Sequence, residues 1–141
     1  MKWVLLILLA LVAIYTCKEP TNLQELKVKY NEFLTKIQTE NVDPRFDVLN
    51  KRILISGFRG GNAEVGYNVN KGDEIGICVN GTTNQMFHVL IHELAHSTVR
   101  EYDHSNQFWT NFNDLKRLCV QWGIYQEINS DSNFCGKYIR D

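Results

Sequence analysis

The sequence carries no excess of charge of either sign and is poor in proline. Of its 141 residues, 15 are Lys or Arg, 16 are Asp or Glu and only two are Pro, which gives a formal net charge of −1. Proteins that bind nucleic acid through their overall field are strongly basic, so this charge gives no reason to expect such binding. The length fits one small domain, and a hydrophobic content of 44% is enough for that domain to bury a core.

Cysteine is also scarce, and no two of the four cysteines are spaced as CxxC. This excludes a zinc ribbon and a thioredoxin-type redox pair. Cys119 and Cys135 can be joined by a disulfide if the domain faces an oxidising compartment. The alternative is that they are buried free thiols, and the sequence leaves both states open.

Long hydrophobic runs are missing except at the N-terminus, where residues 3–17 contain no charged side chain and follow Lys2. Fifteen helical residues span roughly 22 Å, which is less than the ~30 Å hydrocarbon core of a bilayer. A signal peptide needs small residues at its cleavage site, and the run instead ends with Tyr15 and Cys17. An uncleaved N-terminal membrane anchor is therefore favoured over a signal peptide, and the expected location is membrane-anchored or secreted/lumenal.

Hydrophobic spacing predicts that residues 18–141 form a single α+β domain, preceded by the N-terminal hydrophobic helix of residues 1–17. Apolar residues recur at three- and four-residue steps in the expected helices and alternate in the expected strands. The predicted elements are helices at 21–39, about 84–100 and about 105–122, and strands at 52–57, 63–70 and 74–80. Gly123 is expected to end the last helix, and a wrapping loop with a short strand follows it.

Two turns connect the predicted strands into a short antiparallel sheet. The glycine-rich turn at 57–62 is not a phosphate-binding loop, because it lacks the GK[ST] that contacts phosphates. Residues 70–73 (Asn-Lys-Gly-Asp) predict a tight turn, so the last two strands form a hairpin. Thr21 or Asn22 is expected to cap the first helix of the domain.

The central helix carries the motif His92-Glu93-Leu94-Ala95-His96. Two histidines four residues apart lie on one face of a helix, so both imidazoles can reach one metal ion. Glu93 projects beside that ion, where it can take a proton from a bound water. Apolar residues surround the motif, and buried His and Glu side chains without a partner lose hydration energy. A zinc ion supplies the partner.

A catalytic zinc site needs a third protein ligand and one open position for water. His104 follows His96 after seven intervening residues and is the best third ligand. Glu101 and Asp103 lie in the same segment and are the alternatives, although both are typical of solvated loop charges. His88, one turn before the motif, is expected to support the ligands or pack in the core, because a fourth ligand would exclude the water.

Three segments, in this order, resemble the WLM metalloproteases, relatives of SprT and Spartan in the minigluzincin-like HExxH superfamily. Residues 66–75 (GYNVNKGDEI) are similar to the family's G-x-N-x-N-x-G-x-x-I hairpin. The HExxH motif follows. Residues 104–109 (HSNQFW) are similar to the third-ligand segment, which has an aromatic residue four positions after the histidine. The resemblance covers about residues 57–118, close to half the chain.

The resemblance implies a small zincin-like domain that acts as a zinc-dependent metallopeptidase. His92, His96 and His104 would hold Zn²⁺, and Glu93 would be the catalytic base that activates a zinc-bound water to hydrolyse peptide bonds. The hairpin would be an edge beside the active site that can pair with an extended substrate. By analogy with the family, the substrates are proteins or DNA-crosslinked proteins, and nucleic acid is a partner only on this analogy.

Two features depart from the family pattern. The spacer between His96 and His104 is longer than in WLM proteins, so the loop that carries His104 must bulge. The hydrophobic residues 3–17 stand in place of the tails through which longer relatives recruit DNA or ubiquitin-like partners. The alternative function is a catalytically silent, membrane-tethered zinc-binding or interaction domain, and the intact Glu93 favours the enzyme over it.

Overall fold

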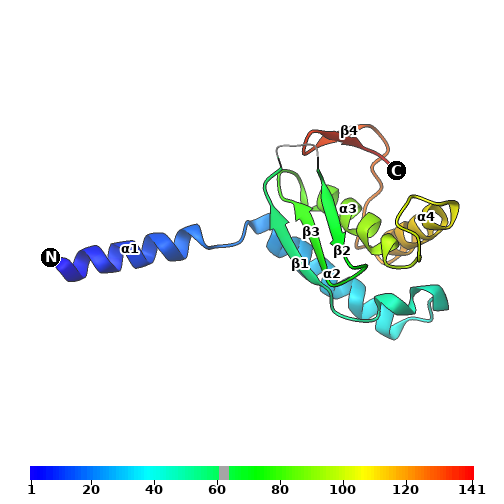
Figure 1. Ribbon diagram of the computed structural model, residues 1–141, viewed down its shortest axis with the longest axis horizontal. Helices are drawn as coiled ribbons and strands as arrows, with labels where there is room; N and C mark the ends of the chain where they lie inside the picture. The colour runs from blue at the N-terminus through cyan, green and yellow to red at the C-terminus, as the bar shows by residue number, and fades with distance from the viewer. Residues whose placement is uncertain (61–63) are drawn as a thin grey trace.

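A three-stranded sheet with α-helices packed against it forms the body of the protein (Figure 1). The computed structural model describes residues 1–60 and 64–141. In chain order the elements are α1 (Lys2–Thr16), α2 (Thr21–Thr39), the 3₁₀ helix η1 (Pro44–Leu49), β1 (Leu54–Phe58), β2 (Gly66–Val69), β3 (Glu74–Cys78), α3 (Thr83–His96), α4 (Asn106–Gln121), β4 (Ser132–Phe134) and β5 (Lys137–Ile139). The predicted α+β class is confirmed.

The N-terminal hydrophobic segment forms α1, which projects away from the body of the protein (Figure 1). None of its 15 residues is buried. Among the described residues, no single helix has both the length and the hydropathy needed to cross a membrane. Helices α1 and α2 meet both criteria only when they are taken together, and they are bent by 52° relative to each other.

Helix α2 begins and ends where the sequence predicts, and its apolar face is buried in the core. The buried residues keep the three- and four-residue spacing: Leu23, Leu26, Tyr30, Phe33, Leu34 and Ile37. The predicted cap is wrong, because Pro20 precedes the helix and no side chain caps it. The Asn22 amide instead donates to the carbonyls of Val79 and Gly81, at 2.8 and 2.9 Å, and so links α2 to the end of β3.

The sheet is mixed, so the predicted antiparallel arrangement is correct for one pair of strands and wrong for the other. The strand order is β1-β3-β2, with β3 antiparallel to β2 and parallel to β1. The central strand is also the most buried, since Ile75 and Ile77 are fully buried and the glycine between them is buried too. A strand buried in this way needs a partner on both edges, and β1 supplies the second one.

The hairpin predicted at residues 70–73 is confirmed. Val69 pairs with Glu74, and the Val69 carbonyl accepts hydrogen bonds from the N–H groups of Gly72 and Asp73. The glycine-rich turn predicted at 57–62 lies partly outside the described residues. So does the first residue of the strand predicted at 63–70, and β2 itself begins at Gly66.

Helix α3 begins with a capping box, in which Thr82 accepts from the Gln85 N–H and Gln85 accepts from the Thr82 N–H. It ends at His96, four residues before the predicted end at 100. The hydroxyl of Thr98 donates to the Ala95 carbonyl at 2.6 Å, and such local bonds compete with continued helix. The chain therefore leaves the helix directly after the HExxH motif.

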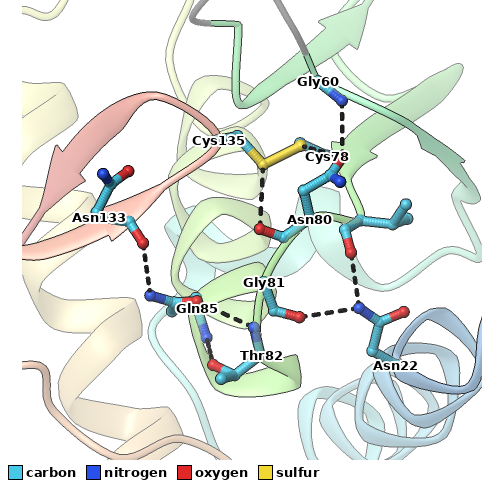
Figure 2. Close-up of a disulfide and its surroundings, with 10 residues drawn as sticks. Asn22, Gly60, Cys78, Asn80, Gly81, Thr82, Gln85, Asn133 and Cys135 are labelled. Atoms are coloured by element: carbon cyan, nitrogen blue, oxygen red, sulfur yellow. Dashed lines mark hydrogen bonds between the residues drawn. A yellow bond between two sulfur atoms is a disulfide. The ribbon is translucent and has the colours of Figure 1, made fainter.

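The C-terminal segment forms a β4–β5 hairpin that a disulfide fixes to the sheet (Figure 2). Cys135, in the turn of the hairpin, is joined to Cys78 at the end of β3. Of the two states that the sequence left open, the disulfide between Cys119 and Cys135 is therefore excluded, and the free buried thiol is correct for Cys119 alone. Cys119 is a free thiol on the buried face of α4, and burial raises the pKa of that thiol well above its ordinary value.

Removing this disulfide is expected to destabilise the fold. It closes a loop across 57 residues, for which chain entropy predicts a contribution of about 4 kcal/mol to the free energy of unfolding. We therefore expect a Cys78→Ala/Cys135→Ala chain to unfold at a clearly lower urea concentration. The exposed Cys17→Ser variant is the matched control, and equal midpoints for the three chains would contradict the prediction.

Candidate metal centre

The structure brings His92, His96 and His104 together, as the sequence predicts. The first two project from the last turn and a half of α3, and the third lies in the loop before α4. One ring nitrogen from each can be chosen so that all three lie within 4.8 Å of one another. The Nε2 atoms of His92 and His104 are 3.1 Å apart. Two nitrogens bound to one tetrahedral zinc lie roughly 3.3 Å apart, so this geometry fits a shared ion.

Aromatic side chains from α4 pack against the three imidazoles. The Phe108 ring is fully buried, and its centroid lies 4.4 Å from that of His96 and 5.0 Å from that of His92. Trp109 lies 5.5 Å from His104, centroid to centroid. These contacts restrict the rotation of the imidazoles, and one side of the cluster is therefore apolar.

Burial keeps two of the imidazoles neutral. Burial, followed by the neighbouring imidazoles of His96 and His104, lowers the pKa of His92 to about 3. Burial, His104 and the Lys71 ammonium lower the pKa of His96 to about 4. A metal binds the neutral ring through its lone pair, so at pH 7 both side chains are in the protonation state that ligation requires. Three imidazole nitrogen donors fit a catalytic zinc site.

Glu93 lies between two of these histidines and is 7% exposed. Burial, and then the negative charge of Glu64, raise the pKa of its carboxyl group to about 7. Gly66 on β2 faces it: a Cβ atom there would lie 3.3 Å from Oε1 of Glu93 and only 2.6 Å from Cγ1 of Val89. The lack of a side chain at Gly66 therefore leaves room for the carboxylate beside the cluster.

Strand β2 also holds the backbone of the HExxH helix. The Asn68 amide donates to the Glu93 carbonyl and to the Ser97 hydroxyl, both at 2.8 Å. Asn68 lies two residues after Gly66, and alternate residues of a strand share a face. Both residues belong to the predicted hairpin motif, but their contacts with α3 were not predicted. The two-residue spacing was the available signal.

The other candidate ligands lie outside the cluster. The Glu101 carboxylate accepts a hydrogen bond from the Ser105 hydroxyl at 2.5 Å, and Asp103 is exposed. His88 is buried, and its Nδ1 atom lies 2.9 Å from Oδ1 of Asp141. Although burial opposes ionisation, hydrogen bonds from His88 and from the Tyr125 hydroxyl keep the pKa of Asp141 below its ordinary value. The prediction that His88 packs in the interior is confirmed, and its partner was not predicted.

The three histidines lie at the edge of a cleft of about 570 Å³. The cleft is lined by β2, by α3, by Tyr102 of the loop after α3, and by Lys137 and Ile139 of β5. Tyr102 contributes an aromatic ring to this lining. Tyr67 instead stacks on Phe58, with ring centroids 5.7 Å apart.

Comparisons with known proteins add one partial relative. No family model matches the chain, and no solved structure matches it. "Uncharacterized protein R325" of Acanthamoeba polyphaga mimivirus is 30% identical over an 83-residue alignment that covers 52% of this chain and 42% of the viral protein. The chain thus spans less than half the length of this relative, whose name assigns no activity.

Replacing the third histidine tests the ligand set. A His104→Ala variant is expected to bind zinc at least roughly 100-fold more weakly, because the loss of a supporting contact alone already weakens metal sites by roughly 10–100-fold. Competition with a chromogenic chelator measures the affinity. The control is Asp103→Ala, which removes the exposed carboxylate directly before His104. A larger loss in the Asp103 variant than in the His104 variant would contradict the assignment.

Proposed function

We propose that this protein is a zinc-dependent metallopeptidase that hydrolyses peptide bonds. The observation that carries the proposal is the position of the Glu93 carboxylate, which is buried in the same cleft as three convergent imidazoles. A structural zinc site needs no such carboxylate. A buried acid without a chemical role would only destabilise the fold.

The proposed mechanism divides the work between the metal and the protein. Zinc, when bound, lowers the pKa of a coordinated water toward ~7 and polarises the scissile carbonyl. Glu93 takes the proton of the attacking water and then delivers it to the leaving amine. Burial raises the pKa of this carboxyl group to about 7 in the metal-free chain, and a bound cation would lower it again, so that Glu93 would be ionised and able to accept the proton. During both steps the Phe108 and Trp109 rings of α4 hold the imidazoles in place.

Strand β2 supports a polypeptide as the substrate. It lies at the edge of the sheet, because β3 is its only partner within the described strands. The free edge can add an extended peptide by backbone hydrogen bonds. Residues of β2 also line the cleft that holds the histidines, so a peptide paired with this edge would pass the metal. A DNA-crosslinked protein as substrate is supported by the resemblance to WLM proteases alone.

Two features support a location at a membrane or in an extracellular or lumenal compartment. Helix α1 presents an unbroken apolar surface, which favours attachment to a bilayer. The Cys78–Cys135 disulfide favours an oxidising compartment for the domain. We therefore propose a membrane-anchored or secreted/lumenal peptidase.

Replacing Glu93 tests the mechanism against a catalytically silent zinc-binding domain. A Glu93→Gln chain keeps the shape of the side chain and loses the base, so it is expected to retain zinc and to cleave roughly 100- to 10,000-fold more slowly. Mass spectrometry of peptides released from an unfolded protein substrate measures the rate. Equal activity in the variant would exclude Glu93 as the base. A wild-type chain that holds zinc but cleaves nothing would support the silent domain.

A further inference from the structure

The loop between α3 and α4 carries the third histidine but has no regular secondary structure. Its residues 102–104 are exposed, and Tyr102 is 80% exposed. Ordering the backbone of each free residue opposes binding through the loss of conformational entropy. A ligand on such a loop binds a metal tightly only if other contacts hold the loop in place beforehand.

Asn68 and Asn111 bond to the first two residues of the loop, at Ser97 and Thr98, and Lys71 contacts its middle. The Lys71 ammonium donates to the carbonyl of His96, at 2.8 Å, and to the carbonyl of Glu101, at 2.7 Å. It also lies 4.5 Å from the centre of the Tyr102 ring, within the range of a cation–π contact. Lys71 therefore connects the residue at which α3 ends to the middle of the loop.

The contact at Glu101 extends to the histidine itself. The Glu101 carboxylate accepts from the Ser105 hydroxyl, and that hydroxyl also accepts from the Phe108 N–H as the cap of α4. Ser105 directly follows His104. A fixed Glu101 thus positions the residue next to the third ligand, and Lys71 is the group that fixes Glu101 to the sheet.

The turn that carries Lys71 adopts an unfavourable backbone conformation. Asn70 and Lys71 have φ angles of 49° and 55°, in the left-handed region that lysine rarely occupies. A lysine in this conformation is strained, and the surrounding contacts must offset the strain. The two carbonyl contacts of Lys71 contribute to this, together with the hydrogen bonds within the turn to the Val69 carbonyl and to Asp73.

We propose that Lys71 is a positioning residue that holds the loop between α3 and α4 so that His104 completes the zinc site. This inference rests on the proposed zinc-binding function. The ammonium touches backbone carbonyls and not the reacting groups, so its effect on the site runs through the loop.

The direction in which the zinc affinity changes when Lys71 is replaced distinguishes a positioning role from a simple electrostatic one. A positive charge repels a bound cation, so removing a nearby ammonium strengthens zinc binding if charge alone matters. Removing the positioning contacts weakens it. Lys137 lines the same cleft from β5 and, among the described residues, its side chain makes no hydrogen bond, ion pair or cation–π contact with the loop. It is therefore the matched control for charge.

The test compares Lys71→Met, Lys71→Arg and Lys137→Met in the full chain, kept in detergent because of α1. We expect Lys71→Met to bind zinc roughly 10–100-fold more weakly. Its cobalt-substituted form should show the visible spectrum of His104→Ala, and Lys71→Met should add little to His104→Ala in the double variant. Lys71→Arg should recover most of the affinity, and Lys137→Met should bind at least as tightly as wild type.

Hydrogen exchange of the metal-free chains separates positioning from general stability. Faster exchange confined to residues 97–105 of Lys71→Met supports the proposal. Faster exchange throughout the core, or failure of this variant to fold, would place Lys71 in the stability of the fold and overturn it. Wild-type affinity with an unchanged cobalt spectrum in Lys71→Met would also overturn it, as would equal weakening in Lys137→Met. A wild-type chain that binds no zinc would instead refute the proposed function itself.

Discussion

The packing of β2 and its turn against the end of α3 is the interaction on which the site depends. Three positions along this segment contact the HExxH helix in succession. Gly66 leaves space for the Glu93 carboxylate, Asn68 bonds to the Glu93 carbonyl, and Lys71 bonds to the His96 carbonyl. The strand and the turn after it thus hold the backbone of the helix at Glu93 and at His96, where the next loop begins. The same strand presents the free edge of the sheet to the cleft.

Burial explains why these residues are suited to a metal. Withdrawal from water disfavours every charged form, so the imidazoles lose their protons and the Glu93 carboxyl group retains its proton to a higher pH. The apolar environment comes from the buried core of α3 and from the aromatic face of α4. A bound cation would reverse this balance by favouring the Glu93 carboxylate. The protonation states that burial imposes on the imidazoles, as well as the geometry of the site, therefore favour the binding of a metal.

Local patterns in the sequence predicted the helices and the histidine cluster, because each depends on residues close together in the chain. The spacing of Leu23, Leu26 and Tyr30 predicted helix α2, and the HExxH motif predicted two of the three clustered histidines. Contacts between distant segments were not predictable in this way. The parallel pairing of β1 with β3, the Cys78–Cys135 disulfide and the link from His88 to Asp141 each join segments far apart in sequence. The early end of α3 involves the hydrogen bonds from Thr98 to the Ala95 carbonyl and from Lys71 to the His96 carbonyl, and the second of these joins segments far apart in sequence.

The measurement that tests the central claim most directly is X-ray absorption at the zinc edge on the full chain loaded with one equivalent of zinc. A three-histidine site that is open to water gives a first shell of three imidazole nitrogens and one further light ligand, all at ~2.0–2.1 Å. A shell of four imidazoles would mean that His88 closes the site to water. A sulfur ligand at ~2.3 Å would place the metal at a cysteine. Either result would contradict an open three-histidine centre beside Glu93.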